Sequence, residues 1–294
     1  MPQTLSREYA AALAAVPERA RALLEGAIDA HVHASPDPYA ARRTDSRQLV
    51  RMAVAAGMAG LVLKSHEYPT QPLAWALQEE TPGFRVHGAL SLDQANGGIN
   101  PEAVEVSLRM GATVIWMPTF DSVMSRSRPM PGREFTTPPV PVVDDRGALL
   151  PAVHEVLDCI RRHDAVLASG HLSGDETLTL LRESRRRGIR SVITHASFWI
   201  PVEVQQEVAR LGGHIEHCAI ASTRPNGDEV TADIVQQVRA VGIEHVVLST
   251  DLGQADHPDP PVGFGQWIER FLAAGFSAQD VGRMVRRNPG ELLG

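Results

Sequence analysis

A regular alternation between short apolar runs and helical stretches is the feature that most constrains the fold of this chain. Apolar stretches typical of strands occupy residues 27–33, 60–66, 84–92, 113–119, 165–172, 191–196, 214–221 and 245–251. Amphipathic helical patterns lie between them at 45–57, 100–111, 153–164, 175–188, 201–213 and 231–242, with a weaker one at 70–83. Apolar strands that alternate with helices favour a parallel sheet covered by helices. Eight such units predict a (β/α)8 barrel of the TIM type, with a doubly wound open sheet as the alternative.

Two segments stand outside this alternation. Residues 1–25 form an amphipathic pattern with scattered glutamates, which predicts an N-terminal helix rather than a signal peptide. Residues 120–150, after the fourth strand, are rich in proline and turn-forming residues. Loops of this length are usually functional, and we expect this one to lie over the active face as an active-site loop. Because no linker or repeat interrupts the pattern, we predict a single domain over residues 1–294.

Charge and cysteine content argue against several classes of function. The net charge of −7 disfavours nucleic acid or an anionic membrane as the main partner. No apolar run approaches the roughly 20 residues that span a bilayer. The two cysteines, Cys159 and Cys218, lie far apart and form no CxxC motif. We therefore expect no disulfide framework and a cytoplasmic location.

Histidines and an aspartate gather at the predicted strand ends. His31 and His33 end the first strand two residues apart, so their side chains point to the same face. The others are His66, His171, His195 and Asp251, at the ends of strands two, five, six and eight. Strand ends of a barrel open on one face, and imidazoles with a carboxylate suit a divalent transition metal. Taken singly, each has a simpler explanation: a surface pair, a hydrogen-bonded core histidine or a helix cap.

This order of motifs resembles a single-domain branch of the amidohydrolase superfamily of metal-dependent hydrolases. The resemblance runs from "IDAHVHASPD" to the closing "VRRNPGELLG", and it implies a distorted (β/α)8 barrel. It implies that the metal ligands are His31, His33, His171 and Asp251, and that Asp251 is also the catalytic base. His195 would be a ligand of a second metal or a catalytic imidazole that polarises the substrate. The implied cofactor is one or two divalent ions, zinc by default, with manganese, iron and nickel as alternatives.

The chain departs from two-metal members of this family at the fourth strand. Those members often carry a bridging carboxylated lysine or glutamate there, whereas this strand reads "TVIWMPTFD". The available lysine is Lys64, after the second strand. Three roles are open for Lys64: it takes up carbon dioxide and bridges two metals, it binds an anionic substrate group as an ammonium, or it forms an ordinary ion pair.

Arginines and an aromatic residue near the predicted mouth indicate a substrate class. Guanidinium groups recognise carboxylates and phosphates, so their number favours a small anionic substrate, although a solvated surface role explains any one of them equally well. The candidate substrate-binding residues are Arg42, Arg43, Arg126, Arg224, Trp116 and His66, and the same loop adds Arg128 and Arg133. His66, which shares a face with Lys64 by strand alternation, is also a candidate metal ligand.

These residues predict a hydrolase that cleaves an amide, lactone or ester bond with a metal-activated water. A divalent cation lowers the pKa of its water from about 16 to about 7, and Asp251 would take up the proton. The missing bridge on strand four favours a metal-dependent nonoxidative decarboxylase as the main alternative, and a phosphoesterase is another. A barrel that binds a metal or ligand without catalysis is the non-enzymatic alternative. The sequence leaves open the substrate, the number of metals and whether the chain forms a homo-oligomer.

Overall fold

A computed structural model describes residues 5–128 and 133–294 of the chain. Its strands form one parallel sheet in chain order, with helices around it, which confirms the predicted (β/α)8 barrel. The strands are β1 (Ile28–Val32), β2 (Gly60–Leu63), β3 (Arg85–Ser91), β4 (Ala112–Trp116), β5 (Val166–Ala168), β6 (Ser191–Ile193), β7 (His214–Cys218) and β8 (Val246–Ser249). Shifts of register between β1 and β2 and between β3 and β4 make the sheet irregular.

All eight predicted strands are present, but each ends one to four residues before its apolar run does. At three of these ends, after β5 (Val166–Ala168), β6 (Ser191–Ile193) and β8 (Val246–Ser249), the backbone turns into a conformation that a strand cannot adopt. Gly170, His195 and Asp251 have φ angles of 63°, 51° and 52°, all in the left-handed region. The candidate residues at these ends therefore lie in the connections directly after the strands.

The helices cover the sheet in the manner of a (β/α)8 barrel. They are α1 (Arg7–Ala14), α2 (Glu18–Leu24), α3 (Ser46–Ala55), α4 (Gln71–Gln78), α5 (Pro101–Arg109), α6 (Val123–Arg126), α7 (Pro151–Arg162), α8 (Gly174–Arg187), α9 (Ala196–Trp199), α10 (Val202–Arg210), α11 (Gly227–Val241), α12 (Pro260–Ala273), α13 (Ala278–Gly282) and α14 (Asn288–Leu293). In the described ranges, no helix combines the length and the apolarity needed to cross a bilayer.

The predicted N-terminal helix over 1–25 is wrong in one respect, because the segment forms two helices. Ser6 caps α1 by accepting a hydrogen bond from the Tyr9 backbone N–H, and α1 ends at Ala14. Pro17 then occupies the N-cap of α2. A proline has no N–H to donate and cannot continue the first helix, so the chain restarts there. Residues 1–4 lie outside the described residues.

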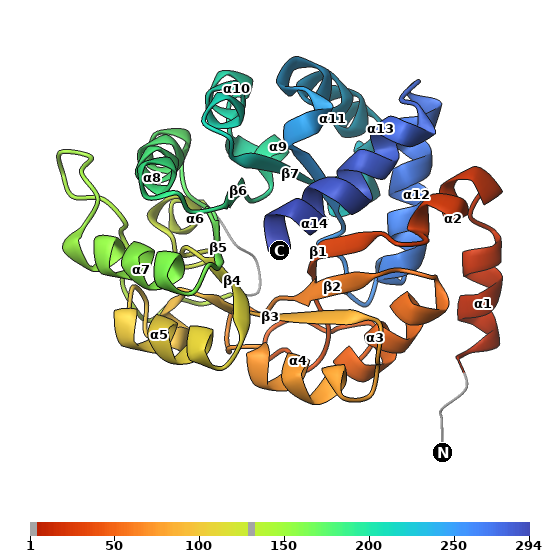
Figure 1. Ribbon diagram of the computed structural model, residues 1–294, viewed down its shortest axis with the longest axis horizontal. Coiled ribbons are helices and arrows are strands. Elements are labelled where there is room, and N and C mark those ends of the chain that lie inside the picture. The colour runs from red at the N-terminus through yellow and green to blue at the C-terminus, as the bar shows by residue number, and fades with distance from the viewer. Residues whose placement is uncertain (1–4, 129–132) are drawn as a thin grey trace. The chain divides into compact units, whose positions relative to one another are not determined.

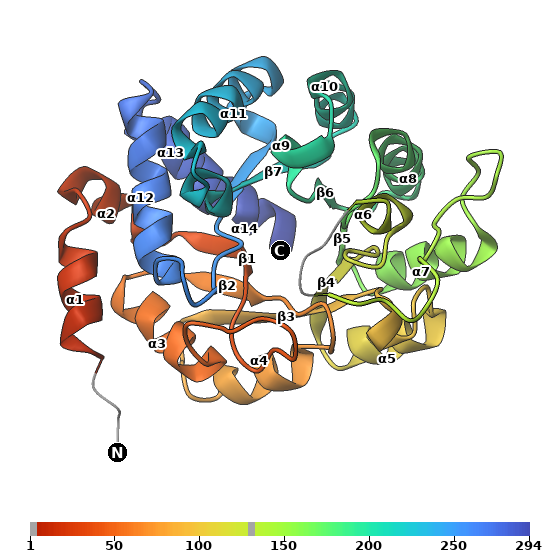
Figure 2. The same ribbon diagram turned by 180° about the vertical axis from the view of Figure 1, so that it is seen from behind.

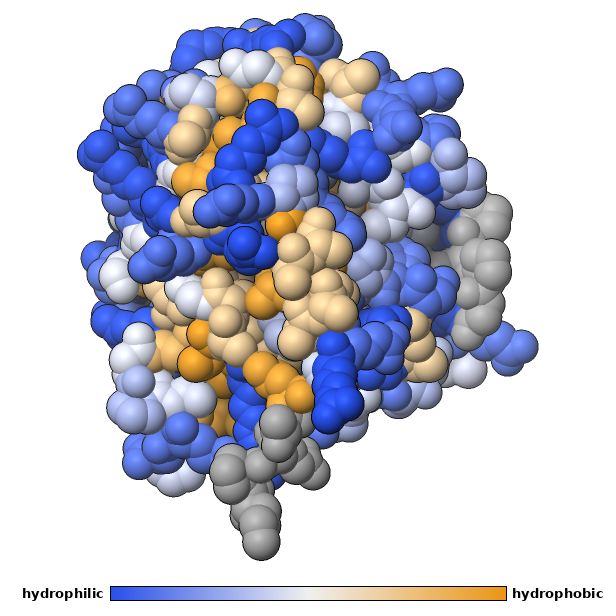
Figure 3. Space-filling model, turned by 90° about the vertical axis from the view of Figure 1, so that its right-hand side faces the viewer, coloured by the Kyte–Doolittle hydropathy of each residue, from blue (hydrophilic) through white to orange (hydrophobic). Residues whose placement is uncertain are grey.

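The chain divides into two compact units, Met1–Leu63, Ala76–Val86 and His217–Glu291 in the first and Lys64–Trp75, His87–Glu216 and Leu292–Gly294 in the second. In the first unit β1 lies beside β2, and α2 lies along α12 (Figure 1). In the second unit α5 packs against α7, and β4 lies beside β5 (Figure 2). Figure 3 shows the side of the first unit that carries α1 and α2, where hydrophobic residues lie among hydrophilic ones.

The predicted loop over 120–150 contains local structure. Ser122 caps the short helix α6, and its backbone bridges to Val140. A second bridge joins Val143 and Leu149. Residues 129–132 of this segment lie outside the described residues. The loop is therefore anchored at both of its ends, close to the strand ends that carry candidate site residues.

Candidate functional site

Two imidazoles and a carboxylate converge in the first unit. The Nε2 atom of His31 lies 3.2 Å from Oδ1 of Asp251, and Nε2 of His33 lies 3.0 Å from the same oxygen. All three residues are buried, and their donor atoms lie within 4.8 Å of one another. His31 belongs to β1, His33 follows it, and Asp251 follows β8. Three of the predicted metal ligands are thus brought together.

Backbone contacts hold this group in place. The Asp251 N–H donates to the His31 carbonyl at 2.7 Å, and the His33 N–H donates to the Leu252 carbonyl at 2.8 Å. The backbone of Gly253 lies so close to that of His33 that a Cβ atom on Gly253 would be 2.1 Å from the His33 carbonyl oxygen. Asp251 itself has a φ of 52°, a costly conformation for a residue other than glycine, of the kind that gathers at functional sites.

Asp29 ties the two chain segments of this group to each other. Its carboxylate accepts the Thr250 backbone N–H at 2.9 Å, the Thr250 hydroxyl at 2.6 Å and the His31 backbone N–H at 3.3 Å. Burial raises the pKa of Asp29 to about 7, against the lowering effect of these hydrogen bonds. The aspartate therefore orients the backbone on both sides of the site.

The donor set of this group fits a divalent transition metal. Two imidazole nitrogens and one carboxylate oxygen are the ligands that zinc and its neighbours accept, and three protein ligands leave a position for water or substrate. The buried carboxylate faces both Nε2 atoms within 3.2 Å, so the three donors already share one small volume. His31, His33 and Asp251 would hold the ion.

His171 and His195 lie together in the second unit, with ring centroids 5.2 Å apart. The His171 carbonyl accepts a hydrogen bond from the Ser122 hydroxyl at 2.6 Å, and its Nδ1 lies 3.2 Å from Oγ of Ser125. Both serines belong to the loop over 120–150, so the loop positions this imidazole directly. Trp199 packs against both rings, at 5.0 and 5.9 Å between centroids.

The sequence analysis missed a buried carboxylate beside His195. Glu216 of β7 is 3% exposed, and its Oε2 accepts the His195 backbone N–H at 3.3 Å. Cys218 lies two residues further along the same strand and so shares its face. Both offer atoms that can ligate a metal. The available signal was the run "HIEHC", in which a charged residue interrupts a buried strand.

Lys64 packs against Trp116 in the second unit. Its Nζ lies 5.3 Å from the centre of the indole ring, and both side chains are buried. Since β2 ends at Leu63, strand alternation does not set the direction of Lys64 or of His66. This contact joins the candidate bridging lysine to a candidate substrate-binding residue, and the carboxylation of Lys64 stays a prediction.

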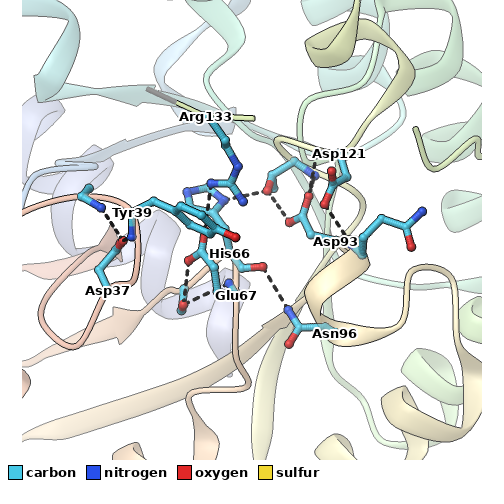
Figure 4. Close-up of polar contacts among 12 residues, drawn as sticks. Asp37, Tyr39, His66, Glu67, Asp93, Asn96, Asp121 and Arg133 are labelled. Carbon is cyan, nitrogen blue, oxygen red and sulfur yellow. Dashed lines mark hydrogen bonds and ion pairs between the residues drawn. The ribbon is translucent and has the colours of Figure 1, made fainter. Parts of the chain in front are cut away.

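His66 is held by a chain of hydrogen bonds (Figure 4). Its Nδ1 lies 2.6 Å from the Thr119 hydroxyl oxygen, and that hydroxyl donates to the buried carboxylate of Asp93. The Asn96 side-chain amide donates to the His66 carbonyl at 3.1 Å, and the imidazole packs on Phe120 with centroids 4.0 Å apart. Asp93 and Thr119 were not among the predicted site residues, because no motif links residues 26 positions apart.

Carboxylates of the chain itself pair with most of the arginines predicted to bind substrate. The pairs are Arg42–Asp37 at 2.6 Å, Arg43–Asp259 at 2.8 Å and Arg126–Asp121 at 2.7 Å. Arg133 pairs with Glu67 at 2.9 Å in the same way (Figure 4). Arg224 lines a cavity of about 360 Å³ in the first unit together with Arg270, Asp228 and Glu229, and Arg270 pairs with Asp228 at 2.6 Å. These pairs reduce the positive charge available to a ligand, and the anionic substrate stays a prediction.

Solved structures share this fold. A probable dipeptidase from Pseudomonas aeruginosa has a TM-score of 0.67 at 12% identity, covering 100% of this chain and 98% of its own. A lactonase from Listeria monocytogenes has a TM-score of 0.61 at 13% identity, covering 92% and 94%. A 2,6-dihydroxybenzoate decarboxylase from Rhizobium has a TM-score of 0.55 at 13% identity, covering 92% and 98%. These likenesses show that the chain shares its fold with enzymes of several activities.

The family is shown by a match to its model. No curated protein matches the sequence. Residues 26–216 of the 294 match the model of a family described as one of unknown function, DUF6282. The matched range contains β1 to β6 and most of the candidate residues. The chain therefore belongs to the DUF6282 family.

Proposed function

We propose that this protein is a metal-dependent hydrolase that cleaves an amide, lactone or ester bond in a small molecule. The observation that carries the proposal is the buried group of His31, His33 and Asp251, in which two Nε2 atoms lie 3.2 and 3.0 Å from one carboxylate oxygen. Solved structures with the same fold include an amidohydrolase, a probable dipeptidase and a lactonase, which supports this choice of reaction.

Each residue has a role in the proposed reaction. A divalent cation, zinc by default, supplies Lewis acidity and an activated water when bound. Asp251 takes up a proton from the nucleophile and passes it to the leaving group. His195 donates a hydrogen bond to the carbonyl oxygen of the substrate as negative charge develops there. The sequence order predicts that His171 ligates the same ion, and its contact with Ser125 is of the kind that orients a metal-binding imidazole.

The proposal extends to the number of ions and to the charge of the substrate. A carboxylated Lys64 would hold two ions, and otherwise its ammonium would bind an anionic group of the substrate or form an ordinary ion pair. The proposal of an anionic substrate rests on Lys64 and Arg224, because the internal ion pairs of Arg42, Arg43 and Arg126 favour a structural role for those three. Counting ions in the wild type and in Lys64→Ala separates the bridged centre from the single one.

A substrate panel tests the proposed reaction. Protein loaded with Zn²⁺ or Mn²⁺ is assayed with dipeptides, lactones and aryl esters, and we expect turnover of at least one of these bond classes. Asp251→Asn should lower kcat/KM by at least about 100-fold, as loss of a general base does. Asp256→Asn, an exposed aspartate five residues away, is the control and should leave the rate unchanged. Equal rates in the two variants, or no hydrolysis in any class, would refute the proposal.

A metal-dependent nonoxidative decarboxylase is the second candidate. The observation that favours it is β4, which ends at Trp116 and contains no lysine or glutamate to bridge two ions. A 2,6-dihydroxybenzoate decarboxylase shares the fold. Release of carbon dioxide from hydroxybenzoates, without hydrolysis of the panel, would replace the first candidate by this one. A phosphotriester belongs in the panel as well, because a lactonase engineered for organophosphate hydrolysis has the same fold.

A further inference from the structure

Two buried polar residues, Asp93 and Thr119, are linked to His66 by hydrogen bonds and have no part in the chemistry proposed above. Asp93 lies just beyond β3, Thr119 beyond β4 and His66 beyond β2, all in the second unit. Asp93 and Thr119 are completely buried, and His66 is 4% exposed. The three side chains form one continuous series of hydrogen bonds (Figure 4). A buried series of this kind costs free energy unless every donor meets an acceptor, so its donors can be assigned.

The assignment begins at the carboxylate. One oxygen of Asp93, Oδ1, accepts the backbone N–H groups of Thr119 and Asp121, each at 2.9 Å. The other, Oδ2, accepts the Thr119 hydroxyl. An ionised carboxylate can only accept, and a hydroxyl has a single proton to give. Since that proton points to Asp93, the Thr119 oxygen can only accept from Nδ1 of His66, 2.6 Å away.

We propose that Asp93 and Thr119 are positioning residues that hold His66 in its Nδ1–H tautomer, in which Nε2 carries no proton and can only accept. This tautomer depends on neither the metal nor the catalysis proposed above. The ring lies 6.0 Å from that of His171 and packs on Phe120, which keeps it beside a predicted metal ligand. Asp93 and Thr119 thus set the hydrogen-bonding character of His66, a candidate substrate-binding residue.

Asp93→Asn should reverse the whole series. The two backbone N–H groups at Oδ1 need an acceptor, so the oxygen of the new amide stays on their side. Its NH2 group then faces the Thr119 oxygen and donates to it. The hydroxyl proton turns to His66, whose Nδ1 becomes the acceptor and whose proton moves to Nε2. A purely structural role for Asp93 would require no such change of tautomer.

Nitrogen NMR of histidine-labelled, metal-free protein at pH 8 measures the tautomer. Burial raises the pKa of Asp93 to about 6, so its carboxyl is ionised at this pH. The resonances of His66 are identified by their loss in His66→Gln. We expect Nδ1–H in the wild type and in Thr119→Ser, and Nε2–H in Asp93→Asn. An Nε2–H tautomer in the wild type overturns the inference, and so does an unchanged tautomer in Asp93→Asn.

Two further measurements keep the test decisive. If Asp93→Asn does not fold, Thr119→Val takes its place, and it should give a mixture of tautomers because the valine neither donates nor accepts. Zn²⁺ binding is measured on the same samples. Because the tautomer is read in metal-free protein, a failure to bind zinc would count against the proposed function and not against this inference.

Discussion

At the residue scale, the molecule uses one arrangement twice. A buried aspartate accepts both the backbone N–H and the hydroxyl of a threonine, Asp29 with Thr250 in the first unit and Asp93 with Thr119 in the second. Burial raises the pKa of these carboxyls to about 7 and about 6. Thr250 directly precedes Asp251 in the chain, and Thr119 contacts His66. Each aspartate thus fixes a candidate site residue and makes folding sensitive to pH.

We predict that part of the pH dependence of stability comes from Asp93. Its pKa in the folded chain, about 6, lies above the ordinary value of 3.8, so its contribution is complete below pH 3.8 and is lost as pH rises through 6. At about 1.4 kcal/mol per pKa unit, the loss amounts to about 3 kcal/mol. Urea unfolding of metal-free protein between pH 4 and pH 7 should show a smaller fall in the free energy of unfolding for Asp93→Asn. Parallel pH curves for the variant and the wild type would contradict this.

Spacing and chain order were sufficient to predict some site residues but not others. His31 and His33 are two residues apart on a strand, and Asp251 ends the last one, so the prediction needed only strand alternation and the barrel. Asp93, Thr119 and Glu216 act through contacts between strand ends, which depend on the exact point where each strand stops. The sequence does not mark that point.

At the element scale, α6 connects the long loop to the fifth strand. Ser122 accepts the Ser125 N–H as the cap of this helix and donates its hydroxyl to the His171 carbonyl. The helix has only four residues, so these bonds rather than helix propensity hold it in place. The predicted active-site loop therefore holds the segment after β5 in place.

We predict that Ser122→Ala lowers the free energy of unfolding by about 2 kcal/mol. About half is the lost helix cap, and the rest is the His171 carbonyl left without its donor. Ser6→Ala is the matched control, since Ser6 caps α1 through a single bond to the Tyr9 N–H. It should cost about 1 kcal/mol. Equal losses in the two variants, measured by urea unfolding, would show that the bond to His171 contributes nothing.

The close approach of Gly253 to β1 leads to a second prediction at this scale. Gly253→Ala should lower the free energy of unfolding by more than about 2 kcal/mol, because a Cβ atom would lie 2.1 Å from the backbone oxygen of His33. Gly83 also has a positive φ, 88° against 135° at Gly253, but it has open space around it, so Gly83→Ala should cost about 1 kcal/mol. Unfolding curves of both variants separate steric conflict from backbone strain. A loss in Gly253→Ala no greater than in Gly83→Ala would contradict the close approach.

The existence of the elements could be predicted better than their ends. The periodicity of hydrophobic residues along the sequence predicts all eight strands and the main helices. The early strand ends could not be predicted, because the left-handed backbone of His195 and Asp251 is uncommon for any residue other than glycine. The break of the N-terminal segment at Pro17 was predictable in principle, since proline is a strong signal of a helix boundary.

At the scale of the whole molecule, the order of the parallel strands is the basis for assigning residues distant in sequence to one predicted site. Each strand from β1 to β8 lies beside the next one in sequence, and in such barrels chemistry belongs to the C-terminal strand ends. On this basis we predict that the residues after β1, β5, β6 and β8 serve one metal centre. That the chain forms one domain and cleaves a small substrate stays part of this prediction.

The metal content of the purified protein tests the central claim most directly. The account predicts that wild-type protein dialysed against zinc retains at least one equivalent by elemental analysis, and that His31→Ala combined with His33→Ala loses most of it while circular dichroism shows a folded barrel. The control combines His154→Ala with His163→Ala, two partly exposed histidines paired with glutamates, and should bind zinc like the wild type. A full equivalent of zinc in the His31→Ala/His33→Ala protein would contradict the account.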